Sequence, residues 1–284
     1  MILRQLLEDT RSSLASHGVE EACLEADLAL MKALDLTRAR LYASSERAIT
    51  PEEREAVSRD VARRLAGEPW PYISGHWEFY GMELAVGPGV FIPRPETELL
   101  VDLALQAASA FPPDYPLRVA DVCAGSGAIA VALATHLPQA TVYVTDISER
   151  ALETACQNYQ RYGLRGRVAL AQGNLLEPVP EPVDIVVSNP PYIPSPDIPR
   201  LAKEVQAEPL EALDGGGDGL DVIRALMPQA PAKLHRPGAF ILELSPPQGG
   251  EVLALAQSVF PQAECSIHKD LSGRDRALLV EIDL

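Results

Sequence analysis

A short polar turn containing two prolines is the part of the sequence best suited to chemistry. It follows the apolar run 184–188 and consists of Asn189, Pro190, Pro191 and Tyr192. Asn189 is held extended because it precedes a proline, and the prolines restrict φ and lack N–H groups, so the turn is stiff. An NH₂ group on an sp² carbon has two donors, which the Asn189 side-chain oxygen and the Pro190 carbonyl can accept together. The turn therefore predicts binding of a planar amide or nucleobase nitrogen, with Tyr192 stacked on it.

A nitrogen of this kind is a poor nucleophile because its lone pair is delocalised. Holding both N–H bonds favours the pyramidal geometry that the nitrogen reaches as it attacks an electrophilic methyl group. No strong general base is needed, since the proton can leave after positive charge has developed, and no histidine lies next to the turn. We therefore predict Asn189, Pro190 and Tyr192 as catalytic and all four turn residues as substrate-binding. The alternative is a rigid proline-rich loop without chemistry.

A glycine turn upstream is the candidate cofactor site. Residues 124–127 (AGSG) lead from a strand into an apolar helix, so a ligand can approach the backbone and the positive helix N-terminus. Asp146 ends the next strand, where an acid can accept hydrogen bonds from ribose hydroxyls. Asp121 favours a cationic ligand such as a sulfonium over a pyrophosphate, and Asn174 is placed to bind an adenine edge. The predicted cofactor-binding residues are Asp121, Cys123, Ala124, Gly125, Ser126, Gly127, Asp146, Asn174, Leu175 and Asn189.

The glycine spacing alone leaves three alternatives open. Gly125-x-Gly127-x-x-Ala130 also satisfies the dinucleotide fingerprint of dehydrogenases, and a purely structural turn is the third alternative. A dehydrogenase, however, predicts nothing at Asn189. The proline turn therefore favours methyl transfer over hydride transfer.

Both turns require a sheet that brings strand ends together. Short apolar runs alternate with helical stretches beyond Pro113, which predicts an α/β domain with a parallel sheet covered by helices. In such a sheet, ligands bind outside the carboxyl ends of the strands. The predicted strands are Arg118–Cys123, Thr141–Thr145, Val168–Ala171, Asp184–Ser188, Ala239–Leu244 and Ala277–Ile282.

A helical segment precedes this domain. Apolar residues recur at helical spacing from Ile2 to about Leu65, and residues 50–53 (TPEE) form a capping box with proline at the first helical position. Aromatic and β-branched residues between Tyr72 and Ile92, punctuated by glycines, predict a hairpin. We expect a helical domain over residues 1–75, a hairpin linker over 76–95 and the α/β domain over 96–284.

Charge and composition restrict the partners. The 284 residues include 24 basic and 40 acidic side chains, and the net charge of −16 repels phosphate backbones, so long nucleic acid is disfavoured. The four cysteines are scattered and form no metal-ligand cluster, and no apolar stretch is long enough to cross a membrane. We expect a cytoplasmic monomer without a metal ion.

These residues resemble the HemK/PrmC family of protein-(glutamine-N5) methyltransferases, which modify class 1 peptide chain release factors. The resemblance covers essentially the whole chain, and its most specific part is the run IPRPETE at residues 92–98. Asn-Pro-Pro-Tyr is shared with N6-adenine methyltransferases and specifies only the type of nitrogen. The other matching segments are 67–69 with 72–73, 121–130, Asp146, 189–192, 214–221 (DGGGDGLD) and 270–276 (DLSGRDR).

The resemblance implies a class I methyltransferase fold, with a Rossmann-like seven-stranded sheet and an antiparallel last strand. It further implies S-adenosyl-L-methionine as donor, S-adenosyl-L-homocysteine as product, and the glutamine of the release factor Gly-Gly-Gln motif as acceptor, with the helical domain helping to recognise that protein. Arg94 and Glu96 could order a cofactor lid, or form only a cap or salt bridge.

Two departures from the family pattern are visible. Cys123-Ala124 stand where the family often has Gly-Thr, and residues 245–248 (SPPQ) replace a more glycine-rich turn. The first exchange involves small residues and should leave cofactor binding intact, whereas the role of the second loop is open. The alternative functions are methylation of a ribosomal-protein glutamine, N6-adenine methylation of nucleic acid, and a cofactor-binding module without catalysis.

Overall fold

The computed structural model describes residues 1–283, which divide into two compact units. Residues 1–75 form the first unit together with 203–207, and the rest of the chain forms the second. Among the described residues, no helix combines the length and apolar character needed to cross a membrane.

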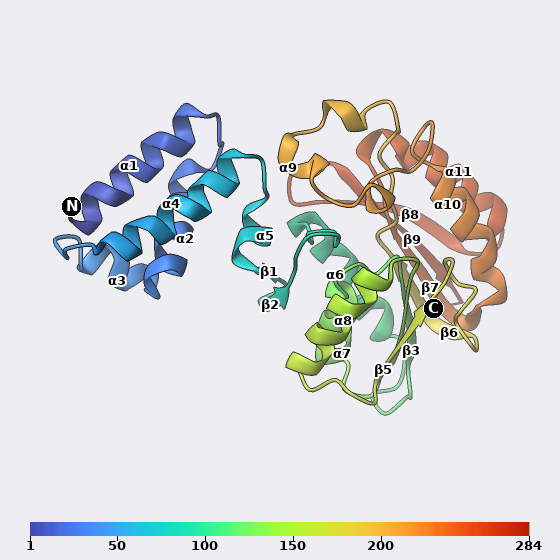
Figure 1. Ribbon diagram of the computed structural model, residues 1–284. Coiled ribbons are helices and arrows are strands. Elements are labelled where there is room, and N and C mark those ends of the chain that lie inside the picture. The colour runs from blue at the N-terminus through green and yellow to red at the C-terminus, as the bar shows by residue number, and fades with distance from the viewer. Residues whose placement is uncertain (284) are drawn as a thin grey trace. The chain divides into compact units, whose positions relative to one another are not determined.

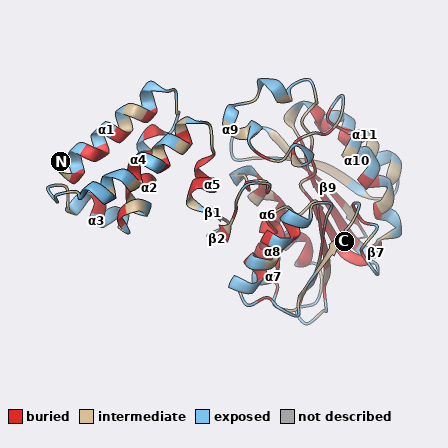
Figure 2. Cartoon of the chain, viewed as in Figure 1, coloured by how far each residue is buried: buried red, intermediate tan, exposed pale blue. Residues whose placement is uncertain are grey.

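The first unit is helical, as the sequence predicts. Its apolar side chains line one side of each long helix and are buried, whereas the other sides are exposed (Figure 2). The predicted capping box is confirmed, because the Thr50 hydroxyl accepts from the Glu53 N–H at 3.2 Å and a Glu53 carboxylate oxygen accepts from the Thr50 N–H at 3.0 Å. The helices are α1 (Leu3–Ser16), α2 (Ala22–Leu34), α3 (Arg38–Ala43), α4 (Pro51–Leu65) and α5 (Trp70–Ser74).

A short helix from much later in the chain also belongs to this unit. In α9 (Lys203–Gln206), Glu204 forms an ion pair with Arg64, which in turn holds Glu25 at 2.6 Å. A side chain added at Gly67 would contact the Lys203 side chain at 3.5 Å. The segment 203–207 is therefore packed as part of the helical unit.

A hairpin begins the second unit. Strands β1 (His76–Phe79) and β2 (Met82–Ala85) pair antiparallel around Tyr80 and Gly81, which both have positive φ, as a tight two-residue hairpin turn requires. The hairpin is shorter than its sequence pattern suggested. Tyr72 lies in α5, which ends at Gly75 in the left-handed conformation.

The core of the second unit is a seven-stranded sheet with the order β5-β4-β3-β6-β7-β9-β8. Strand β9 runs antiparallel to both β7 and β8, whereas β3 to β7 pair in parallel, so the predicted antiparallel last strand is confirmed. The sequence pattern missed β8, which has a mixed polar and apolar composition. The strands are β3 (Arg118–Val122), β4 (Thr141–Asp146), β5 (Val168–Gln172), β6 (Val183–Ser188), β7 (Leu234–Glu243), β8 (Glu264–Lys269) and β9 (Asp275–Ile282).

Helices cover both faces of the sheet (Figure 1). Side chains alternate along each strand, so that Val119 and Ile185 pack under one helical layer while Ala120 and Val186 pack under the other. Burial on both faces explains the nearly continuous apolar character of the central strands. One layer contains α6 (Glu98–Ala108), α7 (Ala128–His136) and α8 (Glu149–Arg161), and the other contains α10 (Asp221–Leu226) and α11 (Gly249–Val259).

Candidate active site

The predicted site residues gather at the carboxyl ends of the central strands. Strand β3 pairs with β4 on one side and with β6 on the other, so the chain turns in opposite directions from this point, where α/β sheets bind ligands. Val122 is in register with both Thr145 and Ser188. The residues that follow these strand ends, including the glycine turn and Asn189, therefore lie next to one another.

The glycine turn after β3 has positive φ angles, which residues with a Cβ atom adopt only at a cost in free energy. Gly125 and Gly127 have φ of +56° and +76°, and Cys123 has φ of +58° although it is not a glycine. A Cβ at Gly127 would lie 2.4 Å from the hydroxyl of Tyr159, so the position requires glycine for space as well. The turn is thereby packed closely on α8 and leads straight into α7.

Asp121 lies on β3, just before this turn, and is fully buried. One carboxylate oxygen accepts from the Ala130 N–H at 3.0 Å, and the other has no hydrogen-bond partner within residues 1–283. Burial raises the pKa of Asp121 to about 8. An unpartnered buried carboxylate oxygen fits a cationic or hydrogen-bond-donating ligand, as predicted for a sulfonium compound with an amino-acid tail.

Asp146 connects the glycine turn to the end of β4. Its two oxygens accept from the Gly125 N–H at 2.9 Å and the Ser148 N–H at 2.8 Å. Burial raises the pKa of Asp146. The carboxylate therefore fixes the turn, while its remaining lone pairs can accept from hydroxyl groups.

Asn174 and Leu175 follow β5, which pairs with β4 on the side away from β3. Asn174 is exposed, and its side-chain nitrogen donates to Glu177 at 3.3 Å. Leu175 is buried with φ of +52°, and its carbonyl accepts from the Thr145 hydroxyl at 2.7 Å. At the end of β5, Asn174 is therefore open to a ligand from solvent, whereas the Leu175 side chain belongs to the core.

The turn after β6 presents the predicted pair of acceptors. Asn189 is half-buried, and its Nδ2 atom donates to the Thr97 hydroxyl at 3.1 Å. Neither Asn189 Oδ1 nor the Pro190 carbonyl makes a hydrogen bond to any part of the chain that the structure describes. Pro190 and Pro191 are buried, which fixes the turn. Both acceptors therefore remain available for an NH₂ group.

Tyr192 is held by an acid that sequence reasoning missed. Its hydroxyl donates to Glu243 at 2.9 Å, and Glu243, at the end of β7, is fully buried. The other Glu243 oxygen accepts from the Thr97 hydroxyl at 2.7 Å. Burial raises the pKa of Glu243, while the two hydroxyl donors and the charge of Arg276 act in the opposite direction. An acid at the end of an otherwise apolar buried strand was the available signal.

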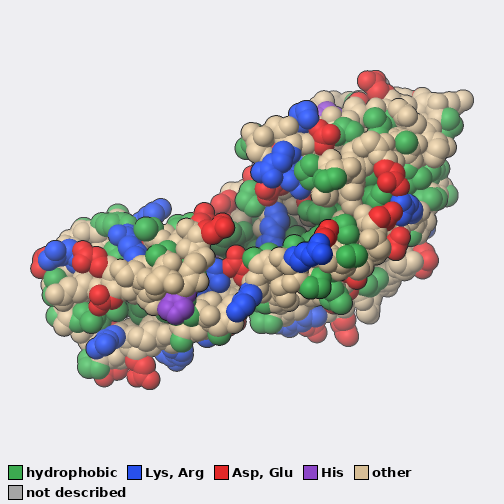
Figure 3. Space-filling view, turned by 90° about the horizontal axis from the view of Figure 1, so that it is seen from above, with side chains coloured by type: hydrophobic (Ala, Val, Ile, Leu, Met, Phe, Trp, Pro, Cys, Tyr) green, Lys and Arg blue, Asp and Glu red, His purple; other side chains and the backbone are tan. Residues whose placement is uncertain are grey.

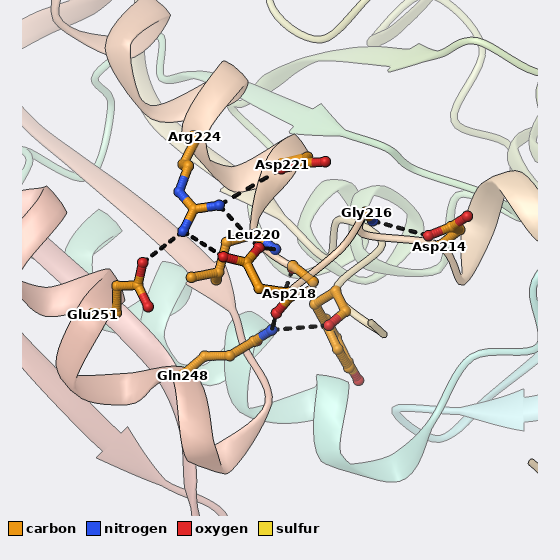
Figure 4. Close-up of polar contacts among 10 residues, drawn as sticks. Asp214, Gly216, Asp218, Leu220, Asp221, Arg224, Gln248 and Glu251 are labelled. Atoms are coloured by element: carbon orange, nitrogen blue, oxygen red, sulfur yellow. Dashed lines mark hydrogen bonds and ion pairs between the residues drawn. The ribbon is translucent and has the colours of Figure 1, made fainter. Parts of the chain in front are cut away.

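The glycine-rich segment 214–221 supports the same turn, and Figure 4 shows the polar contacts of this segment with Gln248 and Arg224. Gln248 donates through Nε2 to the carbonyls of Tyr192 at 2.9 Å and Gly219 at 3.2 Å. The Arg224 guanidinium, in α10, donates to the Asp218 carboxylate at 2.7 Å and so ties the segment to this helix. The loop 245–248, whose role the sequence left open, therefore connects the segment to the proline turn.

The run 91–98 is anchored by an acid from beyond the proline turn. Glu208 is buried, forms an ion pair with Arg94 and accepts from the Ile92 N–H at 2.9 Å. The Arg94 guanidinium lies 4.8 Å from the centre of the Phe91 ring. Arg94 thus makes a structural ion pair. Thr97, in the same run, accepts a hydrogen bond from Asn189.

Comparison with known proteins agrees with this fold. The PrmC N-terminal domain matches residues 5–75, and the methyltransferase small domain matches residues 97–250. The ribosomal protein L11 methylase of Lactobacillus delbrueckii subsp. bulgaricus shares the fold, with 24% identity, a TM-score of 0.50, and coverage of 70% of this chain and 84% of that one. Fold and site together define a class I methyltransferase.

Two curated relatives extend the match to nearly the full length. The release factor glutamine methyltransferase of Moorella thermoacetica is 42% identical over 98% of both chains, and that of Geobacter sulfurreducens is 42% identical over 97% of this chain and 95% of its own. The chain belongs to the family of release factor glutamine methyltransferases.

Proposed function

We propose that this protein transfers a methyl group from S-adenosyl-L-methionine to the side-chain amide nitrogen of the glutamine in the Gly-Gly-Gln motif of class 1 peptide chain release factors. The observation that carries the proposal is the pair of free acceptors, Asn189 Oδ1 and the Pro190 carbonyl, beside the glycine turn of a methyltransferase. The activity named in the relatives, at 42% identity over the full chain, supports the same acceptor.

The residues around the glycine turn fit the proposed donor. When bound, S-adenosyl-L-methionine supplies an electrophilic methyl group on a positively charged sulfur. Asp121 offers an unpartnered buried oxygen to the amino-acid part of the donor, and Asp146 offers lone pairs to the ribose. We further assign Asn174 and Leu175 to the adenine, and the turn residues 123–127 with Asn189 to the remaining contacts. S-adenosyl-L-homocysteine is the expected product.

The proline turn performs the chemistry by positioning. Asn189 Oδ1 and the Pro190 carbonyl accept the two N–H bonds of the glutamine amide, which directs the nitrogen lone pair away from both. As the nitrogen pyramidalises and gains positive charge, its N–H bonds become stronger donors, so the two acceptors bind the transition state more tightly than the ground state. Pro191 stiffens the turn, and Tyr192 packs against the planar amide. After the methyl group has moved from sulfur to nitrogen, the nitrogen loses its extra proton to solvent, so no histidine is assigned as a base.

Charge favours a protein substrate over a long nucleic acid. The net charge is −16, and on the face shown in Figure 3 basic side chains occur in small groups among acidic and uncharged ones. We assign recognition of the release factor in part to the helical unit, which matches the PrmC N-terminal domain. We infer that the reaction takes place in the cytoplasm, where translation ends.

Replacement of Asn189 by alanine tests the amide clamp. Asn189→Ala removes one of the two acceptors without altering Asp121 or Asp146, so methyl transfer to a purified release factor should fall by about a hundredfold or more, as when one oxyanion-hole donor is removed. Binding of S-adenosyl-L-methionine, measured by calorimetry, should weaken only slightly, because Asn189 supplies one contact among the several assigned to the donor. An Asn189→Ala enzyme with nearly full activity would refute the clamp.

A matched control separates loss of chemistry from loss of structure. Asn174→Ala removes an exposed amide of the same type on the cofactor side. It should weaken donor binding while methyl transfer at saturating donor remains close to that of the parent enzyme. If both variants weaken donor binding equally and leave the rate at saturation unchanged, the assigned roles are wrong.

A further inference from the structure

We propose that Thr97 and Glu243 are positioning residues that set which end of the Asn189 amide faces the substrate. The inference deepens the proposed function and rests on it, because the amide orientation matters only if Asn189 accepts a hydrogen bond from the substrate NH₂ group. Thr97 lies just before α6 and Glu243 at the end of β7, so the two arrive at Asn189 from separate elements.

Glu243 determines which of the neighbouring groups donate hydrogen bonds and which accept them. As a carboxylate, Glu243 has acceptors only, and its two oxygens receive the hydroxyls of Thr97 at 2.7 Å and Tyr192 at 2.9 Å. Glu243 is fully buried, so each oxygen depends on these donors rather than on bulk water. The Thr97 hydroxyl proton is therefore committed to Glu243.

Commitment of that proton determines the orientation of Asn189. A hydroxyl has one proton, so Thr97 Oγ1 can only accept from Asn189, and the 3.1 Å contact must come from the Nδ2 end of the amide. Asn189 Oδ1 then faces away from Thr97, where it makes no hydrogen bond to residues 1–283. The reversed amide would place two lone-pair-bearing oxygens against each other at Thr97.

The same reversal would disable the substrate clamp. It would turn the NH₂ group of Asn189 toward the NH₂ group of the substrate, so two donors would meet in place of a donor and an acceptor. Glu243 also holds Tyr192, the other end of the proline turn. One buried carboxylate therefore orients both the amide acceptor and the aromatic side chain of the turn.

Variants of Thr97 test the inference in the full-length enzyme with a purified class 1 release factor. Thr97→Val keeps the shape but removes the hydroxyl, so kcat should fall by about tenfold or more, with the KM for S-adenosyl-L-methionine changed less than about twofold. Thr97→Ser keeps the hydroxyl and should restore most of the rate. Thr154→Val, which removes another buried hydroxyl in α8, is the control and should leave kcat unchanged.

Glu243→Gln is the second test, chosen because its amide can donate to Thr97 and so allows the reversed arrangement. It should lower kcat in the same way, with thermal unfolding close to that of the parent enzyme. Full kcat in both Thr97→Val and Glu243→Gln would overturn the inference, as would a Thr97→Ser variant as slow as Thr97→Val. A parent enzyme that transfers no methyl group to glutamine would instead refute the proposed function.

Discussion

The substitution Gly219→Ala tests whether the glycine-rich segment supports the proline turn. Gly219 has φ of +82°, and a Cβ there would lie 2.3 Å from the Tyr192 carbonyl oxygen and 2.6 Å from Gln248 Nε2. Real Cβ contacts are essentially never shorter than 3.0 Å, so the carbonyl must retreat by about 0.7 Å. The Tyr192 backbone and the Gln248 hydrogen bond to it are therefore displaced together.

The expected loss of stability in Gly219→Ala is the sum of two separate costs. A left-handed backbone costs a residue with a Cβ about 1–2 kcal/mol, and overpacking adds about 1–3 kcal/mol, so the free energy of unfolding should fall by about 2–5 kcal/mol. A misplacement approaching 1 Å at a positioning group can cost about a hundredfold in rate. We therefore expect a large loss of kcat in the fraction that remains folded, with donor binding retained.

Gly217→Ala is a matched control in the same segment, because its Cβ would contact nothing within 4 Å and its φ is not in the left-handed region. Urea unfolding and methyl transfer to a release factor are measured for both variants. Gly217→Ala should resemble the parent enzyme in both assays. If Gly219→Ala is as stable and as active as Gly217→Ala, the segment does not support the turn.

Three further predictions concern other parts of the chain. Cys123 has φ of +58°, so Cys123→Gly should be more stable than Cys123→Val by about 1–2 kcal/mol; a Val variant of equal stability in thermal unfolding would contradict this. Burial raises the pKa of Asp121 to about 8, so the folded state holds a proton that the unfolded state loses near pH 4, and ionisation on raising the pH destabilises the fold. Asp121→Asn should therefore gain stability relative to the parent chain from about pH 4 to 8 and level off above; a pH-independent difference in urea unfolding would refute the assignment. Asp27 is buried and holds Arg11 at 2.6 Å, so Asp27→Ala should destabilise the helical unit by about 2–3 kcal/mol, whereas the exposed Asp9→Ala should have little effect on unfolding followed by circular dichroism.

The fold was largely predictable because its determinants are local. The central strands are rich in apolar and β-branched residues, and the capping box at Thr50 marks the start of α4. Strand β8 was missed because it lies at the sheet edge and mixes polar with partly buried residues, which gives no clear period. Helix α9 was also missed, since nothing in its own sequence indicates that Glu204 pairs with Arg64.

The candidate site was predictable only where it follows strand ends. Asp121 and Asn189 were found because each stands beside a recognisable turn, and strand register brings them to neighbouring strand ends. Thr97 and Glu243 meet across 146 positions of sequence, and their hydrogen bond depends on how α6 and β7 pack. Contacts of this kind are products of tertiary structure, so spacing along the chain cannot reveal them.

The proposed reaction is tested most directly by locating the methyl group on the release factor. A purified class 1 release factor is incubated with the enzyme and labelled S-adenosyl-L-methionine, and the modified residue is located by mass spectrometry of its peptides. We expect one methyl group on the side chain of the glutamine in Gly-Gly-Gln, formed about a hundredfold more slowly or worse when Asn189→Ala replaces the parent enzyme. A methyl group on any other residue, or label on DNA or ribosomal protein but not on the release factor, would contradict it.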